Sequence, residues 1–173
     1  MKLHYYGYVS NFLRKRLMFW DTSEPIGKVT DRTIRYISLA GKLTKPAVQF
    51  AYMRTCMNGW PTFQRMHHCS SFTGSNICVF GCGNGSDSLK HYGHCNIIKA
   101  AFVKLFPDKE WRPGMEHRLC LCNTTSEKDL QDNVRFIYAM YRTFNLTRHS
   151  CTDDLDIVKV LMEFFKQSRW KRS

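Results

Sequence analysis

The cysteine and histidine residues between positions 78 and 95 limit the possible structures of this chain most strongly. Cys78, Cys82, His91 and Cys95 follow the pattern C-x3-C-x8-H-x3-C. Thiolate and imidazole are the ligands that zinc prefers, and four of them complete its tetrahedral coordination. The glycines of the segment 81–85 permit a tight turn, and two residues that are four apart share one face of a helix. The sequence therefore predicts a zinc site in which a turn supplies Cys78 and Cys82 and a helix supplies His91 and Cys95.

Four protein ligands leave zinc no open position for water, so we expect the Zn²⁺ to be structural and not catalytic. His94 is a rival to His91 as a ligand, and the run from His67 to Cys69 offers other candidates. A second metal site is an alternative for a further group of residues, namely His117, Cys120, Cys122 and Cys151. The C-x-C spacing suits one tetrahedral ion poorly, so the favoured interpretation of that group is reduced core cysteines.

The sequence around these cysteines and histidines resembles motifs of a known protein family. The stretch "MRTCMNGWPTFQRMHHCSSFTGSNICVFGCGNGSDSLKHYGHC" contains R-T-x-x-N-G-W-P-T-x-x-R, then C-x-F-G-C, then D-S-L-x-H-Y-x-x-C. These motifs are similar to the zinc-binding region that follows the polymerase in non-LTR retrotransposon reverse transcriptases, over about residues 47–105. The resemblance implies a helical appendage that contacts nucleic acid. It also implies that the metal ligands are Cys78, Cys82, His91 and Cys95.

The catalytic part of that family has no counterpart in this sequence. A two-metal polymerase needs carboxylates that hold two Mg²⁺ ions, and 173 residues are too few for a polymerase palm beside the zinc region. The paired acids Asp153 and Asp154 follow the zinc region, and they fit the start of a helix, where acids stabilise the dipole. We therefore expect a fragment derived from a reverse transcriptase, with no enzymatic activity and no small-molecule substrate.

The charge of the chain indicates an anionic partner. Lysine and arginine number 26 against 14 acids, so the net charge is +12, which favours nucleic acid or an anionic membrane surface. Basic residues beside aromatic ones suit phosphates and unpaired RNA bases, although a solvated basic face is the alternative in each case. The predicted nucleic-acid contacts are Arg14, Lys15, Arg16, Arg54, Arg65, Arg169, Trp170, Lys171 and Arg172.

Hydrophobic periodicity predicts a mostly α fold, with a small helical domain stapled by the CCHC zinc knuckle. We expect residues 1–27 to form a basic aromatic arm and a linker, and residues 28–173 to form the helical zinc-binding domain. The expected helices are Val9–Trp20, a short helix within 28–43 that follows a Thr30/Asp31 cap, Pro46 to Met57, Ser88 to Phe106, one beginning at a Ser126/Asp129 capping box, and one beginning near Thr152/Asp153.

Targeting features favour a mitochondrial location, with the nucleus and the cytoplasm as alternatives. No apolar run approaches the ~18 residues that a membrane span needs. The first twenty residues contain no acid, which is compatible with a mitochondrial import helix. The leading expectation is a mitochondrial ribosomal protein that contacts rRNA and neighbouring ribosomal proteins. Two alternatives stay open, namely a supernumerary subunit of a mitochondrial membrane complex and a DNA-binding zinc protein.

Overall fold

The computed structural model describes residues 2–71, 74–122, 124–149 and 155–169. These residues form nine helices and no strand, so the prediction of a mostly α fold is confirmed. The helices are α1 (Lys2–Leu17), α2 (Ile26–Leu43), α3 (Pro46–Cys56), α4 (Phe63–Met66), α5 (Leu89–Tyr92), α6 (Asn96–Leu105), α7 (Met115–Arg118), α8 (Glu127–His149) and α9 (Ile157–Gln167).

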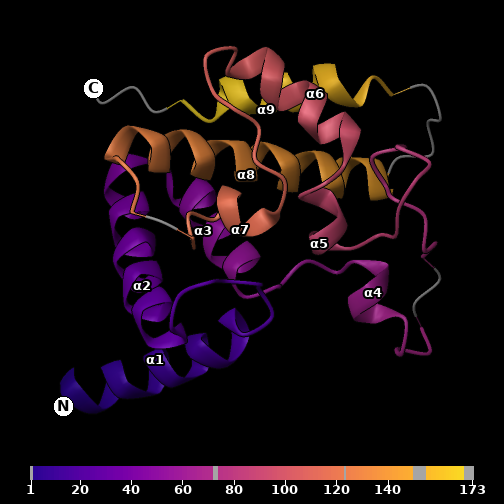
Figure 1. The fold of residues 1–173 in the computed structure, drawn as a ribbon. Coiled ribbons are helices and arrows are strands. Elements are labelled where there is room, and N and C mark those ends of the chain that lie inside the picture. The colour runs from indigo at the N-terminus through magenta and orange to yellow at the C-terminus, as the bar shows by residue number, and fades with distance from the viewer. Residues whose placement is uncertain (1, 72–73, 123, 150–154, 170–173) are drawn as a thin grey trace.

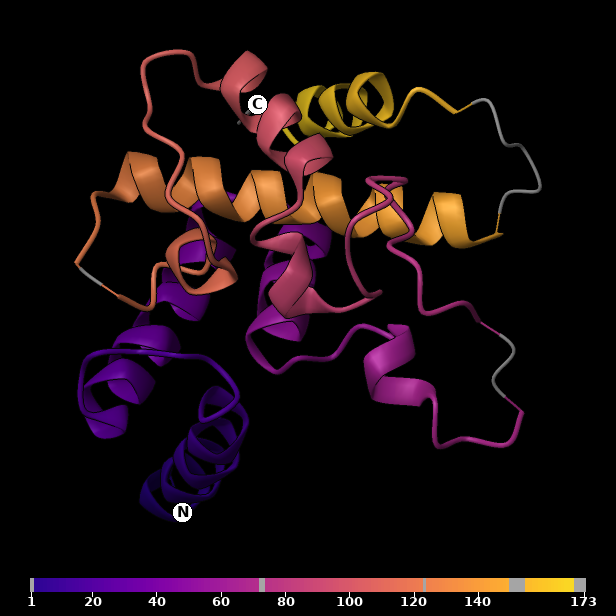
Figure 2. The same cartoon turned by 45° about the vertical axis from the view of Figure 1, so that its right-hand side comes forward.

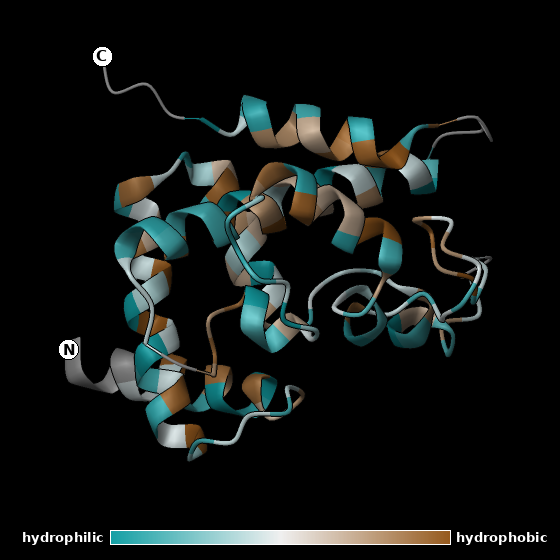
Figure 3. Cartoon of the chain, turned by 45° about the horizontal axis from the view of Figure 1, so that its top comes forward, coloured by the Kyte–Doolittle hydropathy of each residue, from teal (hydrophilic) through white to brown (hydrophobic). Residues whose placement is uncertain are grey.

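The long helix α8 runs through the middle of the molecule (Figure 1). Helices α2 and α3 pack on one side of it, and α9 packs on the other side together with α6. Helix α1 lies against α2, and Figure 2 shows from a second direction that α1 and α9 are at opposite ends of the molecule. In Figure 3, α9 is hydrophilic on its outer side and hydrophobic where it faces the other helices. The fold is therefore arranged in layers around α8.

Local sequence explains why α8 forms. The Ser126 hydroxyl accepts a hydrogen bond from the backbone N–H of Asp129 at 3.1 Å, which confirms the predicted cap. Such a cap contributes about 1 kcal/mol. Leu130, Val134 and Ile137 recur at helical spacing and are fully buried. The cap and the apolar stripe together place α8 at the centre of the core.

The N-terminal arm joins the core through its last turns. Leu13, Leu17 and Trp20 are buried, and the indole N–H of Trp20 donates to the Cys56 carbonyl at 2.8 Å. We predicted a helix over Val9–Trp20, but α1 begins at Lys2 and ends at Leu17. The chain leaves the helix before Trp20, whose side chain caps the end of α3 through Cys56. This contact between distant segments fixes where α1 ends.

Two other predicted helix starts are corrected by the structure. Helix α2 begins at Ile26 with Pro25 in the N-cap position, and the Thr30 hydroxyl donates to the Ile26 carbonyl within the helix. Helix α9 begins after Asp156, whose carboxylate accepts from the backbone N–H of Lys159 at 3.0 Å. The cap predicted at Thr152/Asp153, and the acids Asp153 and Asp154, lie outside the described residues.

Candidate metal centre

The first two cysteines of the cluster lie on a tight backbone turn. The backbone N–H of Cys78 donates to the Gly85 carbonyl, and that of Gly81 donates to the Cys78 carbonyl, both at 3.0 Å. Gly81 and Gly83 have φ angles of +73° and +72°, which other residues rarely adopt without strain. The glycines therefore allow the reversal that brings the two cysteines together.

His91 and Cys95 come from two short helices and not from one. We predicted a continuous helix from Ser88 to Phe106, but α5 ends at Tyr92 and α6 begins at Asn96. In a continuous helix the Gly93 carbonyl would accept from the residue four positions later. Here it accepts from the backbone N–H of Gly114 at 2.9 Å. The pairing of these two glycines interrupts the helix, so the expected shared face does not exist.

The four ligand atoms nevertheless converge. The sulfur atoms of Cys78, Cys82 and Cys95 and a ring nitrogen of His91 all lie within 4.8 Å of one another. The Cys78 and Cys95 sulfurs are 4.0 Å apart, and the Cys82 sulfur is 3.1 Å from Nε2 of His91. With metal–sulfur bonds of ~2.3 Å, sulfurs at two corners of a tetrahedron would be ~3.8 Å apart. The group can therefore hold one metal ion with four protein ligands.

The position of Cys95 favours its thiolate form, which is the form that binds a metal. The hydrogen bond between the Cys78 and Cys95 sulfurs lowers the pKa of Cys95 below its ordinary value, and burial opposes this effect. The backbone N–H groups of Ile98 and Ile97 at the start of α6 add to the lowering. The Cys78 side chain and the local backbone thus favour the form of Cys95 that binds a metal.

Asp87 is a buried carboxylate that we did not identify from the sequence. It is 2% exposed, and its two oxygens accept from the Phe63 backbone N–H at 2.6 Å and from the Tyr92 hydroxyl. Burial, and then the charge of Asp87, raises the pKa of Tyr92 far above its ordinary value. Asp87 and Tyr92 both belong to the D-S-L-x-H-Y motif, which was the available signal. This carboxylate joins the segments before and after the turn.

Trp60 connects the metal region to α8. Its buried ring lies 5.1 Å from Phe144 and 5.9 Å from Tyr92, measured between centroids. Its indole N–H donates to the Thr55 hydroxyl at 2.8 Å. The tryptophan of the N-G-W-P-T motif is therefore a core residue that supports the candidate metal site.

Two of the arginines that we predicted to contact nucleic acid, Arg16 and Arg54, lie close enough to a third, Arg65, for their charges to act on it. Arg16, Arg54 and Arg65 lie in the last turns of α1, α3 and α4, where cations also stabilise helix dipoles. The pKa of Arg65 is lowered by partial burial and then by the charges of Arg16 and Arg54. No salt bridge between described residues neutralises any of the three. We call these residues the arginine cluster.

The other predicted nucleic-acid contacts are placed differently. Arg14 and Lys15 are exposed on α1. Arg169 is exposed and follows α9, and α9 lies at the opposite end of the molecule from α1 (Figure 1). Trp170, Lys171 and Arg172 lie outside the described residues. The described basic residues of the arm and of the tail therefore do not form one surface.

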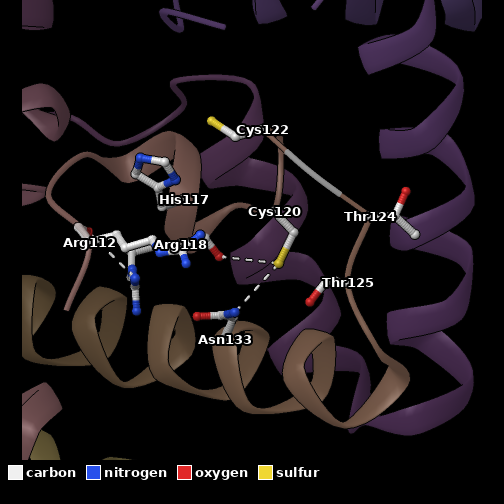
Figure 4. Close-up of a pocket in the computed structure, with 8 residues that line it drawn as sticks. All are labelled: Arg112, His117, Arg118, Cys120, Cys122, Thr124, Thr125 and Asn133. Atoms are coloured by element: carbon white, nitrogen blue, oxygen red, sulfur yellow. Dashed lines mark hydrogen bonds between the residues drawn. The ribbon is translucent and has the colours of Figure 1, made fainter. Parts of the chain in front are cut away.

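The rival metal ligands do not belong to the group formed by Cys78, Cys82, His91 and Cys95. His94 and His68 are exposed, and the ring of His67 stacks on Phe63 with centroids 5.7 Å apart. Within the described ranges, His117, Cys120 and Cys122 do not form a metal-ligating group, and Figure 4 shows the Cys122 sulfur pointing away from Cys120. Cys151 lies outside those ranges.

Gly85→Ala is expected to weaken metal binding by about 10- to 100-fold. A methyl group at Gly85 would lie 2.1 Å from Nδ1 of His91 and would push the imidazole out of place. Gly27→Ala is the matched control, because no atom lies within 4 Å of the added methyl group. Competition with a chromophoric chelator measures both affinities. Equal affinities in the two variants would contradict the placement of His91 in the site.

Comparisons with protein-family models, with curated proteins and with solved structures found no match for this chain. In the part of the chain that the structure describes, no helix is both long enough and apolar enough to cross a membrane. The resemblance to the reverse transcriptase zinc region therefore stays a prediction. The functional argument depends on the geometry of the metal-ligating group and of the arginine cluster.

Proposed function

We propose that this chain is a non-catalytic, RNA-binding structural subunit of a large ribonucleoprotein. The arginine cluster carries the proposal, because separate segments place Arg16 and Arg54 near Arg65, and within the described residues no salt bridge neutralises any of the three. Such an arrangement costs repulsion in the isolated protein, and phosphate groups would relieve it. The net charge of +12 supports the same class of partner.

Exposed aromatic side chains beside the cluster support RNA as the nucleic acid. Tyr8 and Phe12 are 73% and 44% exposed, and the Arg16 guanidinium lies 5.4 Å from the centre of the Phe12 ring. These three residues are spaced by four and share one face of α1. Aromatic rings beside arginine provide stacking platforms for unpaired bases.

Zn²⁺ is the metal that we propose for the Cys78, Cys82, His91 and Cys95 group. Three thiolates and one imidazole suit this borderline-soft ion. With its coordination complete, the ion would stabilise the turn and α5 and would take no part in a reaction. The proposal of a structural role depends on this complete set of protein ligands.

The proposed assembly is a mitochondrial ribosome, with rRNA and neighbouring ribosomal proteins as partners. The acid-free, basic sequence of α1 supports import into the organelle. A salt-sensitive association that RNase does not disrupt would favour a membrane complex instead. Sequence-selective binding of duplex DNA would favour a DNA-binding zinc protein.

The double variant Arg16→Gln/Arg65→Gln is expected to weaken binding to single-stranded RNA. Each lost phosphate contact removes ~0.7 from the slope of log affinity against log salt, so the double variant should lose about 1.4. Arg54 is left in place because its Nε donates to the Gly59 carbonyl at 2.8 Å. Lys99→Gln/Lys104→Gln, at exposed positions on α6, removes the same charge. Equal slopes for the two double variants in fluorescence anisotropy would refute the proposal.

A further inference from the structure

A second polar site lies between the segment around α7 and the helix α8 (Figure 4). It is a pocket of about 160 Å³. The described residues that line it include no acid; they are Arg112, His117, Arg118, Cys120, Cys122, Thr124, Thr125 and Asn133. The exposed residues Arg112 and Thr124 show that the pocket opens to the surface. The site combines two arginines and a histidine with uncharged polar groups.

Arg118 is a buried cation that forms no ion pair with another described residue. It is 5% exposed, and its guanidinium lies 4.3 Å from the centre of the Phe102 ring and 4.9 Å from that of Trp111. Among the residues that the structure describes, its buried Nε has no hydrogen-bond partner, and Nη2 reaches the Arg112 carbonyl only at 3.5 Å. No salt bridge within the described residues includes Arg118. A buried charge in this state carries a large desolvation cost unless an anion accompanies it.

The residues near Arg118 do not supply that anion. Burial raises the pKa of Cys120 to about 11, so its thiol stays neutral at pH 7 and donates to the Arg118 carbonyl. Glu110 pairs with Arg112 at 3.3 Å, but both side chains are largely exposed. Among the described residues no acidic side chain pairs with Arg118, so an anion bound in the pocket would supply the negative charge.

Arg112 is the second cation of the pocket, and both arginines lie near His117. Burial lowers the pKa of His117, and the positive charges of Arg118 and Arg112 lower it further, against the effect of Glu116. Arg112, His117 and Arg118 thus lie near one another, and together they carry a net positive charge. Planar guanidinium groups match the geometry of phosphate oxygens.

We infer that this pocket binds a phosphate group, either as inorganic phosphate or as the phosphate of a small phosphomonoester. Arg118 and Arg112 would be its charged donors. The volume of about 160 Å³ is several times the ~30 Å³ that one water takes in the liquid, which is room for a tetrahedral oxyanion. It is smaller than the ~300–1,000 Å³ of sites that enclose drug-sized ligands. The inference uses no residue of the arginine cluster and does not depend on RNA binding.

Calorimetric titration of the metal-loaded full chain with inorganic phosphate tests this inference, with sodium chloride at equal ionic strength as the reference. Saturable one-site binding is expected. Arg112→Gln should weaken it by about tenfold, because a hydrogen bond to a charged group is lost. Lys104→Gln, on the exposed side of α6, should leave it unchanged. Arg118→Lys should weaken binding as well, and if that variant fails to fold, the Arg112 comparison still decides.

Glycerol 3-phosphate, compared with glycerol, distinguishes the two sources of the phosphate group. Tighter binding of the ester than of inorganic phosphate identifies a phosphomonoester as the ligand. Binding of inorganic phosphate alone identifies the free ion. Heats that match the sodium chloride reference for both phosphates would overturn the inference, and so would an unchanged affinity in Arg112→Gln.

Discussion

Cys82→Ser is expected to release the metal and to unfold the segment from residue 76 to residue 95. Structural zinc contributes roughly 10–16 kcal/mol of apparent binding free energy in small domains, whereas a whole domain is stable by only about 5–15 kcal/mol. Cys82 is half-buried, so the substitution removes little apolar contact of its own. The loss of stability would therefore come from the metal. Metal content by atomic absorption and the solubility of the purified protein measure the result.

Cys69→Ser is the matched control for this experiment. Cys69 is also half-buried but lies outside the metal-ligating group, so the variant should keep its metal and its stability. Removal of the metal from the wild-type protein with a strong chelator should reproduce the Cys82→Ser result. A soluble, metal-free Cys82→Ser protein with the helical content and unfolding midpoint of the wild type would contradict the structural role of the metal.

Asp87→Ala is expected to lower the free energy of unfolding by about 3–5 kcal/mol. The substitution removes the acceptor of the partly buried Phe63 N–H and of the buried Tyr92 hydroxyl, and each unsatisfied buried group costs about 1–3 kcal/mol. Because Tyr92 follows the ligand His91 in α5, metal affinity should fall as well. Urea unfolding of the metal-loaded protein measures the change.

Two further variants serve as comparisons for the unfolding free energy of Asp87→Ala. Asp87→Asn keeps one acceptor oxygen, so it should cost less than Asp87→Ala but more than a surface change. Asp108→Ala removes a carboxylate at an exposed position and should stay within about 0.5 kcal/mol of the wild type. If Asp87→Ala were no more destabilising than Asp108→Ala, the buried bonds of Asp87 would not support the site.

Local signals predicted those parts of the fold that depend on neighbouring residues. The cap at Ser126 and the proline at the start of α3 act within one helical turn, so the sequence was sufficient to place both helices. The break between α5 and α6 depends on the bond from Gly114 to Gly93. That hydrogen bond joins segments that are distant in the sequence, so no local sequence pattern predicted it.

In the candidate site too, some residues could be predicted from the sequence and others could not. Spacing and residue type were sufficient to select Cys78, Cys82, His91 and Cys95, because the chemistry of a metal allows few ligand types. Asp87 was missed because its two partners, Phe63 and Tyr92, are defined only after the chain has folded. The arginine cluster likewise forms from three segments, and the sequence indicated its members but not their proximity.

Sedimentation of the native protein from gently lysed cells, with and without RNase, tests whether it is a subunit of a ribonucleoprotein. The proposal predicts that the protein sediments in a large particle, that RNase collapses this particle, and that mitochondrial rRNA copurifies with it. A particle that RNase leaves intact, or one that cosediments with membrane proteins, would contradict the proposal. It would indicate that the basic residues contact a protein or a lipid and not RNA.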